Sequence, residues 1–206
     1  MTVDDPLRMY LVVLRGAVTE LGRAGELAGA AAVSCVREFA GDPALEQWRE
    51  RPGKVCLRAR TESQWRQVLE EPHTGEVVIA LPPRRRSERG PLLERLQAMS
   101  TELEPPPETA PPHDGVTYLL NPRLTMSSGK TIAQIAHAAV MAADSLDDWD
   151  GLPATVIAPP PDVFAAACER EDLAAKVVDA GLTEVAPGTV TVLALPPRAR
   201  RAPAHA

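Results

Sequence analysis

An internal repeat constrains the fold of this chain more than any other feature of its sequence. The same five residues, Ala-Leu-Pro-Pro-Arg, end two apolar runs, at positions 80–84 and 194–198. Ahead of each run stand, in the same order, an apolar segment, a long segment of small residues, a second apolar segment and a short helical segment. A recurring order of this kind indicates two tandem copies of one structural unit.

The repeat also predicts the secondary structure of each copy. Three strands are expected in each, at 9–14, 54–59 and 77–84 in the first copy and at 116–120, 154–158 and 191–198 in the second. The helices between them include one that begins at Thr61 and one that follows Pro161, with Asp162 as its N-cap. Strands that alternate with helices predict an α/β fold in which a small sheet is covered by helices.

The two copies differ in length and are separated by a proline-rich segment. The second copy contains a segment, Val177 to Thr189, that has no counterpart in the first, so we expect the first copy to lack one strand and its turn. Proline removes backbone donors and favours extended chain, which predicts a semi-rigid linker between the copies. The expected domains are a first copy at 1–100, a linker at 101–114, a second copy at 115–197 and a disordered basic tail at 198–206.

The composition argues against several classes of protein. No stretch approaches 18 consecutive apolar residues, and the N-terminus has no basic-then-apolar pattern, so we expect a cytoplasmic protein without a membrane segment. The three cysteines, Cys35, Cys56 and Cys168, have neither a metal-ligand spacing nor an even number, so neither a metal site nor a disulfide framework is expected.

A polar stripe marks the long helical segment of the second copy. Lys130, Gln134 and His137 fall on one face at helical spacing, on a segment that is otherwise small or apolar. The aligned residues of the first copy, Arg23, Leu27 and Ala30, form no such stripe. The stripe is therefore a candidate site, and its alternative interpretation is the solvated face of an amphipathic helix.

A second polar cluster lies in the segment that only the second copy has. Asp179 ends a valine-rich run, Gly181 permits a sharp turn, and Pro187-Gly188 forms another turn that leads to Thr189. A carboxylate and a hydroxyl could converge at this place. The alternative is a plain hairpin whose Asp and Thr cap its turns.

Together the two blocks resemble a known enzyme family. Met126-Ser127-Ser128-Gly129-Lys130 with Gln134 and His137, followed by the blocks 179–183 and 186–189, resembles the type II peptidyl-tRNA hydrolases over residues 115 to 197. The resemblance implies a four-stranded mixed sheet flanked by helices, without metal or cofactor. It implies the catalytic residues Lys130, Asp179 and Thr189, and the supporting residues Gln134, His137 and Thr183.

The chemistry implied by this resemblance is hydrolysis of the ester between a peptide, or an N-blocked amino acid, and tRNA, which recycles the tRNA. Asp179 would position or activate a water, and Lys130 and Thr189 would donate hydrogen bonds to the carbonyl oxygen and the ribose. The first copy lacks the counterparts of these groups, so we expect it to be catalytically inactive. The alternative function is a non-catalytic module that binds a tRNA end or a protein.

The expected partner, tRNA, conflicts with the charge of the chain. The net charge is -6, whereas binding to a polyanion depends on Lys and Arg. Two arginine clusters are candidates for local tRNA contacts, or else belong to a solubilising loop and tail; they are Arg84, Arg85 and Arg86, and Arg198, Arg200 and Arg201. Because enzymes of this family commonly work as homodimers, we expect a monomer in which the two copies form an intramolecular pseudo-dimer.

Overall fold

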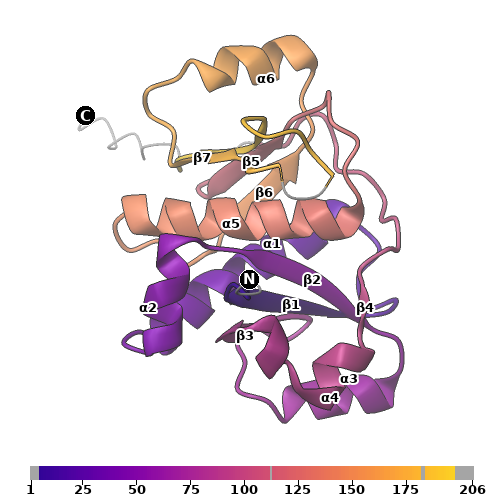
Figure 1. The fold of residues 1–206 in the computed structure, drawn as a ribbon. Helices are drawn as coiled ribbons and strands as arrows, with labels where there is room; N and C mark the ends of the chain where they lie inside the picture. Colours follow the sequence, from indigo (N-terminus) through magenta and orange to yellow (C-terminus); the bar gives the residue numbers. More distant parts are fainter. Residues whose placement is uncertain (1–4, 112, 182–183, 198–206) are drawn as a thin grey trace, which may run out of the picture.

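Helices and sheets alternate in layers through the protein (Figure 1). The computed structural model describes residues 5–111, 113–181 and 184–197. Each copy contributes one four-stranded sheet, and two long helices lie between the two sheets. The predicted fold class, a duplicated α/β arrangement with small mixed sheets flanked by helices, is therefore confirmed.

The two sheets share a common arrangement of three strands. The first has the order β3-β1-β2-β4, with β1 at Arg8–Leu14, β2 at Lys54–Ala59, β3 at Val78–Arg84 and β4 at Gln97–Ala98. The second has the order β6-β5-β8-β7, with β5 at Val116–Leu120, β6 at Ala154–Ile157, β7 at Ala175–Val178 and β8 at Val190–Leu195. In both, the first strand lies between the other two: β1 is parallel to β2 and antiparallel to β3, and β5 is parallel to β6 and antiparallel to β8.

The fourth strand distinguishes the copies. In the second copy β7 pairs with the outer edge of β8, whereas the corresponding edge of β3 carries only an isolated bridge between Thr74 and Ala80. The shorter connection ahead of β3 leaves a single bridge where the second copy has a strand, as the sequence predicted. The first sheet gains its fourth strand at the opposite edge, where β4 pairs with β2.

Two long helices join the copies. Helix α1 (Leu21–Glu38) contacts α5 (Ser128–Ser145), and each also packs on strands of the other copy, α1 on β6 and α5 on β2. Small residues permit this approach, because a Cβ on Gly25 would lie only 2.4 Å from Ile135 Cδ1. Apolar residues of α5 lie in one hydrophobic cluster with the core of the first copy. The two copies therefore share a core and pack face to face.

Three shorter helices cover the outer faces of the sheets: α3 (Glu62–Leu69) and α4 (Gly90–Arg95) on the first sheet, and α6 (Pro161–Cys168) on the second. Helix α2 (Pro43–Glu50) packs on the inner side of the first sheet, where Leu45 and Trp48 share a hydrophobic cluster with α1 and α5. Thr61 caps α3 as predicted, since its hydroxyl accepts the Gln64 N–H at 3.2 Å. The prediction for α6 was wrong: Pro160 is its N-cap, and Asp162 lies in the first turn. Pro161 has the backbone conformation of a first helical residue and needs no hydrogen bond there, so the helix begins before Asp162.

The proline-rich segment is extended and hydrogen-bonded to both copies. Glu104 exchanges backbone hydrogen bonds with Thr19 and Leu21 of the first copy, and Pro107 accepts the N–H of Ala158 in the second at 2.9 Å. These contacts fix the path of the linker along both copies. Within the described ranges, no helix is long and apolar enough to cross a membrane.

Candidate active site

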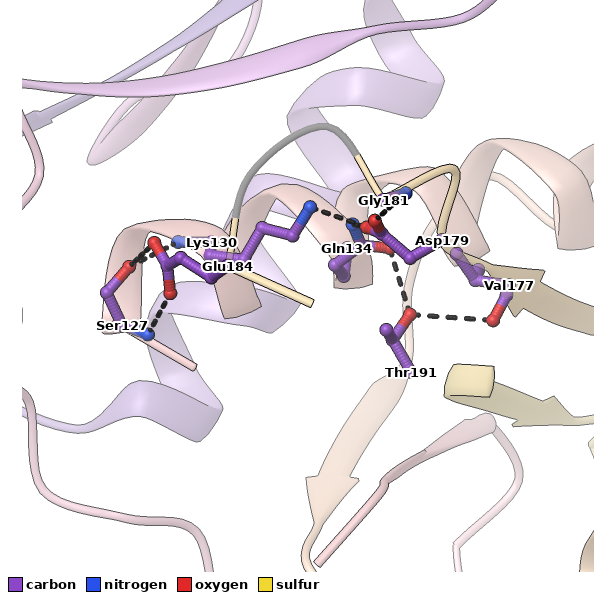
Figure 2. Close-up of polar contacts among 8 residues, drawn as sticks. All are labelled: Ser127, Lys130, Gln134, Val177, Asp179, Gly181, Glu184 and Thr191. Carbon is purple, nitrogen blue, oxygen red and sulfur yellow. Dashed lines mark hydrogen bonds and ion pairs between the residues drawn. The ribbon is translucent and has the colours of Figure 1, made fainter. Parts of the chain in front are cut away.

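Residues from both sequence blocks meet where α5 passes the end of β7. Figure 2 shows Lys130 and Gln134 of α5 pointing toward Asp179, which directly follows β7. Lys130 Nζ donates to Asp179 Oδ2 at 2.5 Å, and Gln134 Nε2 donates to the same oxygen at 2.7 Å. The helical spacing of four residues places both donors on one side of the carboxylate.

Backbone hydrogen bonds hold the Asp179 carboxylate in place. Its Oδ1 accepts the Gly181 N–H at 2.7 Å, in a turn where Gly181 has a φ of +77°. The Asp179 N–H donates to the Thr189 carbonyl at 2.8 Å, and the Asp179 carbonyl accepts the Gly188 N–H at 2.9 Å. The loop from 179 to 189 is thus closed at its base, which fixes the carboxylate against α5.

Asp179 is ionised at neutral pH. Burial would raise the pKa of its carboxyl, because only 5% of the side chain is exposed. The hydrogen bonds from Lys130, Gly181 and Gln134, together with the charge of Lys130, outweigh burial and hold the pKa below its ordinary value. A carboxylate in this state is a weak proton acceptor but a strong hydrogen-bond acceptor.

Thr191 completes this network, and sequence reasoning did not single it out. Its hydroxyl, fully buried on β8, donates to Gln134 Oε1 at 2.9 Å. This bond directs the amide oxygen of Gln134 to Thr191 and leaves its nitrogen to face Asp179 (Figure 2). The available signal was a threonine in an apolar run, Val190-Thr191-Val192, at a position that faces the core.

A second contact missed in the sequence closes the site from the other side. The Glu184 carboxylate accepts both the N–H and the hydroxyl of Ser127, each at 2.7 Å (Figure 2). The Ser127 hydroxyl in turn accepts the Lys130 N–H at 3.2 Å and so caps α5. Glu184 therefore ties the loop after Asp179 to the N-terminus of the helix that carries Lys130.

The network borders a cavity of about 390 Å³ that lies between the two copies. The second copy supplies Lys130, Ala133, Gln134 and His137 from α5 and the segment 177–180 from β7 onward. The first copy supplies Arg8 of β1 and the segment 51–55, which leads into β2. One wall of the cavity thus comes from the copy that lacks the polar stripe.

His137 lines this cavity one turn after Gln134. Burial lowers the pKa of its imidazole to about 3, and the charges of Lys54 and Lys130 act in the same direction against the opposing effect of Asp179. The ring is therefore neutral at physiological pH and can accept one hydrogen bond and donate another. At neutral pH the ring carries no imidazolium proton, so it is suited to form hydrogen bonds and not to act as a general acid.

The other predicted site residues lie elsewhere. Thr189 stands beside Asp179 through its backbone, but it is not among the described residues that line the cavity. Arg84 and Arg85, at the end of β3 and just after it, are not among the described residues that line the cavity, and Arg84 pairs with Glu71 at 3.1 Å. Arg86 begins the short 3-10 helix that follows. Thr183, Arg198, Arg200 and Arg201 lie outside the described residues.

The described part of the first copy, from residue 5 onward, has no equivalent of this network. Arg23, which aligns with Lys130, pairs with Glu26 on its own helix at 3.3 Å. Among the residues that the structure describes, the first sheet has no strand that would carry a counterpart of Asp179. In the part of the chain that the structure describes, no group of three or more His, Cys, Asp or Glu side chains is placed to hold a metal ion.

Comparison with known proteins adds no assignment: no protein-family model matches the chain, and no solved structure matches it significantly. The functional interpretation therefore depends on the residues of the two sequence blocks and on their geometry.

Proposed function

We propose that the protein hydrolyses the ester bond between a peptide, or an N-blocked amino acid, and tRNA. The observation that carries the proposal is the shared Asp179 Oδ2, which accepts hydrogen bonds from Lys130 and Gln134 at the wall of a cavity. These residues belong to the two blocks that resemble type II peptidyl-tRNA hydrolases. Lys130 and Asp179 come from segments 49 residues apart, and both side chains are largely buried.

Asp179 is suited to hold the attacking water. Its Oδ1 accepts the Gly181 N–H and retains a lone pair for a water hydrogen. Because its pKa is lowered, the carboxylate orients the water and stabilises positive charge on it, and does not store its proton. The water oxygen bonds to the ester carbonyl carbon, the bond from that carbon to the ribose oxygen breaks, and the ribose oxygen leaves with a proton that the attacking water gives up.

Lys130 is suited to stabilise the charge that develops on the carbonyl oxygen. One of its three N–H donors is directed to Asp179, which leaves two for the substrate. The ammonium is held on a helix by the ion pair, so it needs little reorganisation as the oxyanion forms. Gln134 keeps the carboxylate in position when Lys130 turns part of its hydrogen bonding toward the substrate.

The decisive experiment is a turnover assay on N-blocked aminoacyl-tRNA with the full chain. We expect Asp179→Asn and Lys130→Ala each to lower the rate by about 10² to 10⁴-fold, the range for losing a water-positioning group or an oxyanion donor. Arg23→Ala, at the aligned position of the first copy, is the matched control and should retain the full rate. Wild-type rates in both site variants of an active enzyme would refute the assignment.

The same assay tests the alternative function, a non-catalytic module that binds a tRNA end. The ion pair is the observation in favour of this alternative, because a 2.5 Å contact between Lys130 and Asp179 gives both residues a structural role without catalysis. A module of this kind would bind deacylated and N-blocked aminoacyl-tRNA alike and leave the ester intact. Turnover by the wild type that is lost in Asp179→Asn would support the hydrolase and contradict this alternative.

A further inference from the structure

The wall of the cavity that comes from the first copy carries an excess of positive charge. Arg8, Arg51 and Lys54 line it, and among the described residues none of the three forms an ion pair with a carboxylate. The lining carboxylate, Asp179, is already paired with Lys130. A chain with a net charge of -6 therefore concentrates unpaired cations at one place.

Lys54 is the most unusual of these cations. Its Nζ is enclosed and has no hydrogen-bond partner among the described residues, and it stands 4.5 Å from the centre of the Trp48 ring. Burial lowers the pKa of this amine to about 7, with the charge of Arg49 acting in the same direction and Asp144 and Cys35 opposing it. Burial without an acceptor therefore disfavours the charged form of this amine, and an anion beside its Nζ would relieve that cost.

The backbone around Lys54 is fixed on both sides. The Gly53 carbonyl accepts the Met9 N–H at 3.0 Å and the Trp48 indole N–H at 2.8 Å. The Arg8 guanidinium lies directly on Gly53, where a Cβ would come within 2.2 Å of Arg8 Nη1. Glycine at position 53 thus permits Arg8 and Lys54 to lie on the same wall, held by α2 and β1.

We propose that Lys54, Arg8 and Arg51 form a subsite for a phosphate group, which the first copy supplies to the cavity of the second. Two guanidinium groups and an ammonium suit a phosphate, because a phosphate has more negative charge and more acceptor oxygens than a single carboxylate. Building on the proposed function, the phosphate is the phosphodiester next to the terminal adenosine of tRNA, whose ribose carries the ester.

This subsite gives the first copy a function at the cavity, although the first copy lacks the polar stripe. By strand register Lys54 pairs with Met9 at the start of β2, and the corresponding residue of β6 is Ala154, which pairs with Val116. Gly115 stands before Val116 where Arg8 stands before Met9. Arg8 and Lys54 therefore have no cationic counterpart at the aligned positions of the second copy. The first copy contributes these cations to the cavity, and the second contributes the network of Lys130 and Asp179.

Equilibrium binding of AMP and of adenosine to the full chain tests the subsite directly. We expect the wild type to bind AMP at least about tenfold more tightly than adenosine, the lower end of what a hydrogen bond to a charged group contributes. Lys54→Met and, separately, Arg51→Gln should reduce this preference to about twofold or less. Arg66→Gln, which removes an exposed charge on α3, is the matched control and should keep the preference.

Thermal unfolding of the same variants separates binding from folding. Lys54→Met replaces an unpaired buried cation by an apolar side chain of similar length, so its melting temperature should equal or exceed that of the wild type. Loss of the AMP preference in a protein of undiminished stability would support the subsite. An unchanged AMP preference in both Lys54→Met and Arg51→Gln would overturn it.

A kinetic comparison distinguishes this inference from the proposed function. The substrates are an N-acetylaminoacyl ester of adenosine and the same ester of adenosine 5′-phosphate. The kcat/KM of the phosphorylated ester, divided by that of the unphosphorylated ester, should fall about tenfold in Lys54→Met. If neither ester is hydrolysed while the AMP preference holds, the hydrolase proposal falls and the subsite stands. If both are hydrolysed at a ratio that Lys54→Met leaves unchanged, the subsite falls. Inorganic phosphate that binds as tightly as AMP would overturn the assignment to a nucleotide phosphate.

Discussion

Thr191→Val tests the network behind Asp179 with the smallest possible change. The substitution keeps the shape of a fully buried side chain and removes the hydroxyl that donates to Gln134 Oε1 at 2.9 Å. Gln134 is itself buried, so its carbonyl oxygen would be left without a donor. The amide would then be oriented only by the bond from its nitrogen to Asp179 Oδ2 at 2.7 Å.

The size of the effect follows from these contacts. A buried acceptor left unsatisfied costs about 1 to 3 kcal/mol, so the free energy of unfolding should fall by about that amount. No cavity forms, because valine and threonine have nearly the same volume. Gln134 loses one of the two contacts that fix its amide, and a resulting shift of the Asp179 carboxylate that costs about 1.4 kcal/mol in the transition state lowers the rate about tenfold.

Two control variants separate the effect of losing the hydroxyl from the effect of a general loss of stability. Thr191→Ser keeps the hydroxyl and loses a buried methyl, so it should lose about 1 kcal/mol of stability and retain the rate. Thr74→Val removes another buried hydroxyl, which donates to the Ala31 carbonyl at 2.7 Å in the first copy. It should destabilise the protein as Thr191→Val does, without an effect on hydrolysis.

The assays are urea unfolding and hydrolysis of N-blocked aminoacyl-tRNA at a temperature where all variants are folded. The expected pattern is a loss of rate in Thr191→Val that neither control shows. Equal rates in Thr191→Val and the wild type, or an equal loss in Thr74→Val, would refute a role for Thr191 in positioning Asp179.

Three further predictions concern the ion pair, the packing of the copies and the partner. The folded pKa of Asp179 lies below its ordinary value of 3.8, so the carboxylate stabilises the fold above that value and its contribution is lost as the pH falls through the lowered pKa. The difference in stability between wild type and Asp179→Asn should therefore shrink in acid titrations followed by circular dichroism. Gly151→Ala should destabilise the protein more than Gly16→Ala in chemical denaturation, because both glycines have positive φ but only at Gly151 would a Cβ approach a backbone atom, Ala30 Cα at 2.7 Å. Replacing the three arginines at 84–86 by Glu should flatten the salt dependence of tRNA binding, and an unchanged slope would place the phosphate contacts elsewhere.

The sequence predicted those features of the fold and site that depend on local pattern. Apolar runs located the six strands that the copies share, and Thr61 capped the helix that it was expected to begin. Helical spacing put Lys130 and Gln134 on one side of α5, which is a property of the helix itself. The length difference between the copies predicted the strand that is missing at Thr74, because a strand needs residues to build it.

Only the tertiary structure could decide which residues from distant segments meet. Lys54 lies 76 positions before Lys130 in the chain, yet the packing of α5 on β2 places both at one cavity. Thr191 and Glu184 acquire their roles in the same way, from the α5 residues that they contact across the second copy. Local pattern determines periodicity and caps within about one turn or one strand, whereas side-chain partners depend on how the sheets and helices pack, which no local spacing specifies.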